Sequence, residues 1–300
     1  MPTLIDFRRR IRSVKNTQQI TRAMKFVAAA KLRRAQERAL AARPYAREMG
    51  HVLQSAMTRI ENPNFPLMAY RPEERILLLV VTGSKGLCGA FNTNVIRKAL
   101  EFLRGHTHQK VRAIPVGKKG RDALRKRHVD LAEEYTSLPA SVEFAQAKEI
   151  ASRVIELFSS GEVDAVYAVF NEFKSVLTQR LLVEKVLPIQ TEHLGDNESH
   201  QDPSERFPER HRGLHVDYIY EEPPDQIYAK LLPRYVEIQI LRYLLESAAA
   251  EHAARMTAMD SATNNAAELI DQLTLYMNKV RQAAITKEII EVVSGAASTD

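Results

Sequence analysis

A glycine-rich segment at residues 83–89 is where the sequence first suggests nucleotide chemistry. Gly83, Gly86 and Gly89 directly follow an aliphatic run, as do loops whose backbone amides bind phosphate. The spacing is GxxGxxG instead of the dinucleotide-binding GxGxxG, and no Gly-Lys-Ser/Thr sequence follows. Neither nucleotide fingerprint is satisfied. We therefore interpret the segment as a tight turn between a strand and a helix, with nucleotide binding as the alternative.

Side chains that could bind a metal ion or form a disulfide are few and poorly spaced. Cys88 is the only cysteine, which excludes an intrachain disulfide and is typical of a reducing compartment. Four histidines fall within residues 193–215, without a cysteine framework or the spacing of a metal site. The sequence therefore predicts no metal, no cofactor and no catalytic residue.

Two cations that interrupt apolar helical patterns are the remaining candidates for a functional site. Lys25 follows Gln18 and Thr21 in a mostly apolar stripe near the N-terminus, and Arg255 lies in a second stripe near the C-terminus. A cation among apolar side chains is costly without an anion, so both residues favour contact with an acidic partner. The alternative is that their long side chains extend to the surface, where the charges meet only water.

The element that carries Arg255 is a long predicted helix. No glycine lies between Gly213 and Gly295 and no proline follows Pro233, so a helix over residues 234–294 would be roughly 90 Å long. Such a length is typical of a coiled coil. Three polar residues interrupt its apolar heptad seam, which comprises Ile238, Leu241, Leu245, Ala248, His252, Arg255, Met259, Ala262, Ala266, Leu269, Leu273, Tyr276, Val280, Ala283, Lys287 and Ile290.

The element that carries Lys25 repeats this pattern. Residues 3–43 contain no glycine or proline, and Pro44 either kinks the helix or begins a new segment. Two long seams at opposite ends of the chain predict an antiparallel left-handed coiled coil of residues 3–58 and 226–296. Two separate amphipathic helices on a larger core are the alternative. The N-terminal seam comprises Leu4, Phe7, Ile11, Val14, Gln18, Thr21, Lys25, Ala28, Leu32, Ala35, Ala39, Ala42, Ala46, Met49, Leu53, Ala56 and Ile60.

Charge is concentrated at the N-terminus. Residues 1–59 hold fourteen lysines and arginines against three acidic residues, a net charge of +11 in a chain whose total is +6. This excess indicates an acidic partner. Nucleic acid is the rival, but the aromatic residues Phe7, Phe26 and Tyr45 form no stacking series. No apolar run approaches the roughly 18 residues that a membrane span requires, and the first residues do not resemble a signal peptide.

Between the two helices, the sequence predicts a Rossmann-like α/β domain at about residues 74–220. Strands that alternate with helices at this spacing indicate a mostly parallel sheet. Residues 191–212 are polar and densely charged, which favours a flexible surface insertion. The flanking coiled-coil helices are assigned to residues 1–60 and 226–297. Within the α/β domain, strands are predicted at 75–82, 110–117, 129–134 (weaker), 163–170 and 175–187, and helices at 92–104, 118–127 and 141–160.

Several stretches resemble the gamma subunits of F-type ATP synthases, and the resemblance covers nearly the whole chain. The most specific stretch is the C-terminal RQAAITKEIIEVVSGAA at 281–297, because it ends a long heptad helix. The chain departs from the family pattern at Phe26, Asp260 and Asn264, where methionine, a basic residue and aspartate are usual. The other stretches are SVKNTQQITRAMKFVAAAK at 13–31, GLCG at 86–89 followed by Asn92, and DYIYEEP at 217–223.

The resemblance implies a non-catalytic rotor subunit, the central stalk, present in one copy per complex. In this family, the coiled coil passes through a ring of alternating alpha and beta subunits. The α/β domain binds the epsilon subunit and the membrane ring of c subunits. Proton-driven rotation forces the three catalytic beta subunits through different conformations in turn. The implied location is the cytoplasmic face of a bacterial inner membrane, and the alternative is a basic coiled-coil scaffold or nucleic-acid-binding protein.

The resemblance also implies which residues contact the partners. The waist, a first contact with the beta subunits, comprises Met24, Lys25 and Arg255. The upper contact with these subunits comprises Arg281, Gln282 and Thr286. An apolar tip comprises Ile289, Ile290, Val292 and Val293, and a foot near epsilon and the c ring comprises Tyr218, Tyr220 and Glu221.

Overall fold

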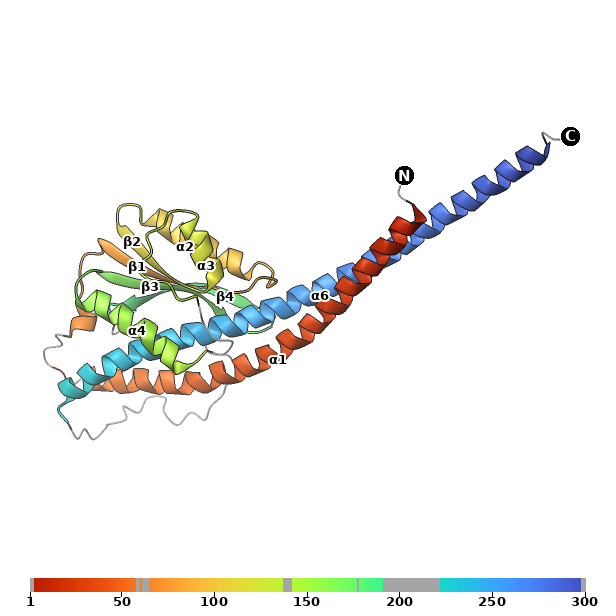
Figure 1. Cartoon of the computed structure of the whole chain (residues 1–300). Helices are drawn as coiled ribbons and strands as arrows, with labels where there is room; N and C mark the ends of the chain where they lie inside the picture. The colour runs from red at the N-terminus through yellow and green to blue at the C-terminus, as the bar shows by residue number, and fades with distance from the viewer. Residues whose placement is uncertain are drawn as a thin grey trace. The chain divides into compact units, whose positions relative to one another are not determined.

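The computed structural model describes residues 3–57, 60, 65–136, 142–176, 178–190 and 222–297 (Figure 1). The chain divides into two compact units, of which the first consists of Met1–Ala30 and Arg255–Asp300 and the second of Lys31–Ala254. Two long helices, α1 (Leu4–Met57) and α6 (Pro224–Ala297), contribute to both units. Their ends lie one or two residues from the coiled-coil bounds 3–58 and 226–296, and α1 ends three residues inside the assigned range 1–60 at each end.

The second unit contains a four-stranded sheet with the strand order β2-β1-β3-β4. Strand β1 pairs in parallel with β2 and with β3, whereas β3 and β4 are antiparallel. The mostly parallel α/β fold expected from the sequence is thus confirmed. The elements are β1 (Arg75–Val81), α2 (Phe91–Gly105), β2 (Lys110–Val116), α3 (Lys118–Arg125), α4 (Phe144–Ser159), β3 (Ala165–Phe173) and β4 (Gln179–Leu187), with a short 3-10 helix η1 (Pro66–Met68) before them.

Both faces of this sheet are covered, which explains why β1 is a continuous apolar run. Leu78 and Val80 of β1 belong to a core cluster with residues of α2 and α3, which lie on one face (Figure 1). Leu77 and Leu79 point to the opposite face and belong to a larger cluster with α4 and α6. The sheet therefore uses both side-chain directions of its central strand to bind helices.

Within the second unit, residues 235–250 of α6 are buried or partly buried on all sides. No residue from Tyr235 to Ala250 is exposed. Apolar residues off the heptad seam, including Val236, Ile240 and Leu244, join the cluster beneath the sheet. A helix whose residues are shielded from solvent on every side is a core helix, even where, as here, some of them are polar. This segment therefore belongs to the core of the second unit, a role that a heptad seam alone does not predict.

The weak strand expected at 129–134 is not formed. Isolated bridges join Leu131 to Ala113 and Tyr135 to Val116. Between these bridges, β2 advances by three residues and its partner segment by four. The extra residue interrupts the ladder, so the expectation of a strand was wrong.

Two other elements begin later than expected. Strand β4 starts at Gln179 because Ser175 and Thr178 form a turn, in which the Ser175 amide donates to the Thr178 carbonyl at 3.0 Å. Helix α4 starts at Phe144, where Glu143 caps it through reciprocal hydrogen bonds with Gln146. The polar segment 191–212 lies outside the described residues.

Candidate functional site

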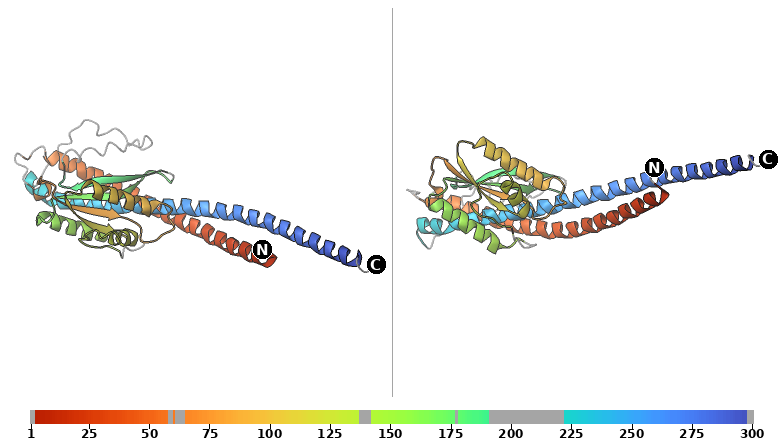
Figure 2. Two further views of the ribbon diagram at one scale, coloured as in Figure 1. Left: turned by 90° about the horizontal axis from the view of Figure 1, so that it is seen from above. Right: turned by 45° about the horizontal axis from the view of Figure 1, so that its top comes forward.

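In the first unit, α1 and α6 run antiparallel and side by side (Figure 2). The Phe7 ring packs against Tyr276, with 5.1 Å between the ring centroids. Further along α1, the Thr21 and Thr263 hydroxyls are 2.8 Å apart and hydrogen-bonded. The residue number falls along α6 as it rises along α1. The antiparallel pairing expected from the two seams is thus confirmed.

The exposure of the seam positions follows the heptad pattern. Every seam residue of α1, from Leu4 to Ala56, is buried or partly buried. The same holds for the seam of α6 from Ile238 to Ala266, whereas most later seam positions are exposed. Burial along both helices therefore recurs every 3.5 residues on average, as in a left-handed coiled coil.

The waist contains an ion pair within the chain. The Lys25 Nζ lies 2.5 Å from the Asp260 Oδ1, and the two side chains are 38% and 47% exposed. Met24 and Arg255 are partly buried. From the sequence, the Lys25 charge was expected to meet either an acidic group of another chain or only water. In the structure its counter-ion is Asp260 of the same chain, which was not predicted.

The upper contact and the tip lie on exposed helix. Arg281, Gln282 and Thr286 are all exposed, and the Thr286 hydroxyl donates to the Gln282 carbonyl at 2.9 Å. Helix α6 extends past the N-terminal end of α1 (Figures 1 and 2). Arg255 and Arg281 are about 39 Å apart along this helix, at about 1.5 Å per residue. The waist and the upper contact are therefore two separate surfaces.

The tip is an exposed apolar surface. Ile289 and Ile290 are each 58% exposed, and Val292 is 72% exposed. Exposed apolar side chains in a continuous group are typical of a binding surface. The side chain of Val293 and the three foot residues, Tyr218, Tyr220 and Glu221, lie outside what the structure describes.

The glycine-rich segment is occupied by side chains of the chain itself. The Gly83 amide donates to the Asn92 Oδ1 at 2.8 Å, and the Asn92 amide group donates to the Lys85 carbonyl at 3.3 Å. A methyl group added at Gly83 would lie only 2.7 Å from the Glu251 carboxyl carbon. Leu87 and Gly89 adopt positive φ angles of 61° and 54°. This geometry favours the tight turn over a phosphate-binding loop.

Among the residues that the structure describes, no helix is both long and apolar enough to cross a bilayer. The same residues contain no group of three or more histidine, cysteine, aspartate or glutamate side chains arranged to hold a metal ion.

The fold and the exposed surfaces define a coiled-coil protein that carries an α/β domain. A family model described as ATP synthase matches residues 3–299. The ATP synthase gamma chain of Solibacter usitatus (strain Ellin6076) is 55% identical over 304 residues, and that of Pelotomaculum thermopropionicum is 45% identical over 300 residues. Both alignments cover 100% of each chain. The chain therefore belongs to the ATP synthase gamma-chain family.

Solved structures share this fold at lower identity. A chain from the central stalk and c-ring structure of the Tetrahymena thermophila mitochondrial ATP synthase gives a TM-score of 0.59 at 24% identity. That match covers 81% of this chain and 99% of the other. A chain from the Euglena gracilis mitochondrial ATP synthase gives 0.65 at 20% identity, with 99% and 94% covered. At these identities the likeness is one of fold.

Removing the Lys25–Asp260 ion pair is expected to have a small effect on stability. Because both side chains are more than a third exposed, the coupling energy between Lys25→Met and Asp260→Asn should be below about 1 kcal/mol. Urea unfolding of the two single variants and the double variant measures it. The exchanged pair, Lys25→Asp with Asp260→Lys, is the matched control and should be close to the parent. A coupling energy above about 2 kcal/mol would contradict the expectation.

Proposed function

We propose that this chain is the central-stalk subunit of an F-type ATP synthase. It is a rotor that transmits the rotation of a membrane ring of c subunits to three catalytic beta subunits, and it is itself non-catalytic. The observation that carries the proposal is the antiparallel helical pair of the first unit, with α6 extending alone past it, in a full-length match to gamma chains. The partners are the alpha, beta and epsilon subunits and the c ring. The location is the cytoplasmic face of a bacterial inner membrane, with one copy per complex.

The mechanism follows from the asymmetry of a single chain inside a ring of repeated subunits. Each beta subunit meets a different side of the helical pair, so the three catalytic sites differ at any moment. Rotation changes which side each beta subunit meets and shifts its conformational equilibrium. The waist, the upper contact and the apolar tip are the surfaces proposed for these contacts. Apolar contacts at the tip suit rotation because they have little directional preference.

The ion pair at the waist makes this contact easy to exchange. A carboxylate of a beta subunit would compete with Asp260 for Lys25 instead of meeting an uncompensated cation. An exposed ion pair contributes at most about 1 kcal/mol, so exchanging one carboxylate for another has a small net cost. Such a surface binds each beta subunit weakly and releases it when the rotor turns to the next one. In this proposal Met24 and Arg255 belong to the same contact with the beta subunits. The foot residues contact the epsilon subunit and the c ring.

Reconstitution with alpha and beta chains tests the proposal. The chain should co-purify with them, and a bead fixed to the α/β domain should rotate when ATP is supplied. The chain alone should hydrolyse no ATP. Failure to assemble, together with binding to DNA of arbitrary sequence that weakens steeply with salt, would favour the basic nucleic-acid-binding alternative.

The assembled complex is expected to be insensitive to dithiol reductants through this subunit. Cys88 is the only cysteine of the chain and is 2% exposed, so no disulfide can form within the chain. ATP hydrolysis should be the same with and without reductant. Cys88→Ser is the control variant. A several-fold activation by reductant that Cys88→Ser abolishes would contradict this prediction.

A further inference from the structure

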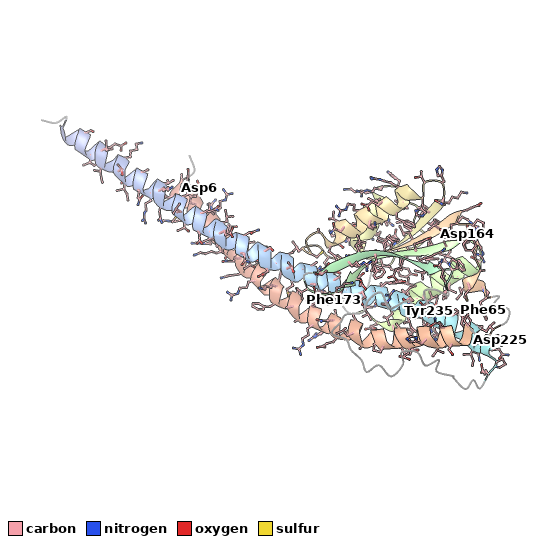
Figure 3. The ribbon with its side chains drawn as sticks, turned by 180° about the vertical axis from the view of Figure 1, so that it is seen from behind. Asp6, Phe65, Asp164, Phe173, Asp225 and Tyr235 are labelled. Atoms are coloured by element: carbon pink, nitrogen blue, oxygen red, sulfur yellow. The ribbon has the colours of Figure 1, made fainter. Side chains whose placement is uncertain are left out.

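The carboxyl edge of the sheet lies against α6 in the second unit. The ends of β1 and β3 and the start of β4 meet at this edge, because β1 and β3 are parallel and β4 returns antiparallel. In open α/β sheets, this edge is where ligands bind. Here α6 takes that position, and Figure 3 marks Phe173 where β3 ends beside it.

The end of β3 hydrogen-bonds to side chains of α6. The Phe173 amide donates to the Glu246 Oε2 at 2.9 Å, and the Asn171 amide donates to the Ser247 Oγ at 3.3 Å. The pairing of β1 with β3 ends at Val169, so these amides lie on an edge that has lost its neighbouring strand. They are two residues apart, and therefore point to the same side. Glu246 and Ser247 thus replace the missing strand for two buried donors.

The strands on either side add further contacts with α6. The Gln179 side-chain amide of β4 donates to the Ala250 carbonyl at 3.1 Å. The Glu251 carboxylate lies against Gly83, directly after β1. Three strand ends therefore contact one stretch of α6, residues 246–251. We call this stretch, together with Arg242 one turn earlier, the joint.

Arg242 extends the joint to the middle of β4. Its Nη2 lies 2.5 Å from the Glu184 Oε2, and its guanidinium lies over the Phe170 ring at 5.8 Å. Burial alone would lower the pKa of Arg242. The interactions with Tyr243 and Glu184 raise it by more than burial lowers it, so the pKa lies above its ordinary value and the side chain stays charged. Positions 242, 246 and 250 are four residues apart and form one stripe of the helix.

We infer that the joint is the element that transmits torque between the α/β domain and α6, with Glu246 and Ser247 as positioning residues. This inference rests on the proposed rotor function. Apolar packing sets the rotation of a helix about its axis only through the shapes of its side chains. Hydrogen bonds are directional, and those at the joint run from a fixed strand edge to the neighbouring residues Glu246, Ser247 and Ala250 of α6. They therefore fix the rotational setting of α6 on the domain that the c ring would drive.

Substitutions at Glu246 separate this role from simple packing. Glu246→Leu keeps the approximate volume and removes the acceptor for the Phe173 amide, whereas Glu246→Gln keeps an acceptor at the same place. Glu149→Leu, at an exposed carboxylate of α4, is the matched control. Gly83→Ala is a milder probe, because its methyl group would displace the end of the Glu251 side chain.

The measurement is ATP-driven rotation of the complex with alpha and beta chains, with a bead attached to the α/β domain through His108→Cys, an exposed loop position. Glu246→Leu is expected to lower the stall torque several-fold while ATP hydrolysis per complex stays near the parent value. Glu246→Gln should restore the torque, and Glu149→Leu should not change it.

The outcomes separate the two proposals. If the parent complex does not rotate, the proposed function is wrong. If the parent rotates and Glu246→Leu gives the parent torque, the joint does not transmit torque. If Glu246→Leu does not assemble, Gly83→Ala decides, because an unchanged torque in that variant overturns the inference and a lowered torque at normal ATP hydrolysis supports it.

Discussion

Gly117→Ala is expected to leave little folded protein. Gly117 lies between β2 and α3 with φ 100° and ψ 143°, a conformation that side chains rarely adopt. An added methyl group would lie 2.1 Å from the Thr82 carbonyl oxygen. That oxygen belongs to the backbone, so no side-chain rotation relieves the overlap. The loss should be at least about 3 kcal/mol, a large fraction of an ordinary domain's stability.

The methyl group of Gly117→Ala would overlap Thr82, a residue at which several elements meet. The Thr82 amide donates to the Val116 carbonyl at 2.8 Å, and its hydroxyl donates to the same carbonyl at 3.1 Å. The hydroxyl also accepts from the Gly120 amide at 2.9 Å. Displacement of Thr82 would therefore disturb the ends of β1 and β2 and the first turn of α3 together.

The yield of folded chain and its urea midpoint measure this effect. Gly105→Ala is the matched control, because nothing lies within 4 Å of a methyl group there and the position is at the end of α2. That variant should stay within about 1 kcal/mol of the parent. A Gly117→Ala midpoint equal to that of Gly105→Ala would contradict the prediction.

Met24→Lys is expected to uncouple the assembled enzyme without preventing its assembly. Met24 is partly buried beside the Lys25–Asp260 pair. A third cation at the waist, added to Lys25 and Arg255, would bind an acidic group of a beta subunit more strongly than the parent methionine does. That contact must be broken at each step of rotation. Hydrolysis should continue, whereas protons pumped per ATP should fall several-fold.

Proton pumping and ATP hydrolysis in the same membrane vesicles give this ratio. Ala23→Lys is the control, because this neighbouring position is exposed and its side chain leaves α1 in a direction about 100° away. The control should keep a ratio near that of the parent. An unchanged ratio in Met24→Lys would show that the waist does not carry coupling.

The long helices could be predicted because their signal is local. Heptad positions such as Phe7 and Met259 are apolar and buried, and uninterrupted sequence determines the helix length. The ion pair could have been found by one further step. Once the seams are placed antiparallel, Lys25 and Asp260 are the opposite charges that fall near each other, and Asp260 already departed from the family pattern.

The joint could not be predicted from the sequence. Glu246 and Ser247 resemble ordinary polar positions of a helix, and their partners are backbone amides more than 70 residues earlier. Those amides need a partner only because β1 ends sooner than β3, which depends on the register of the sheet. The failed strand at 129–134 has a similar origin. A single extra residue between two bridges is enough to interrupt a strand pairing. The apolar pattern of one segment carries no information about the number of residues in the strand that it pairs with.

The burial of α6 beneath the sheet has a consequence for the order of folding during synthesis. The strands leave the ribosome before residues 235–250, which cover Leu77 and Leu79 and bind the free amides of β3. Until then, α4 covers only part of that apolar face and the edge of β3 is open, features that favour aggregation. A fragment that ends after β4 should therefore depend on chaperones. The second unit completes its fold only when most of the polypeptide has been made.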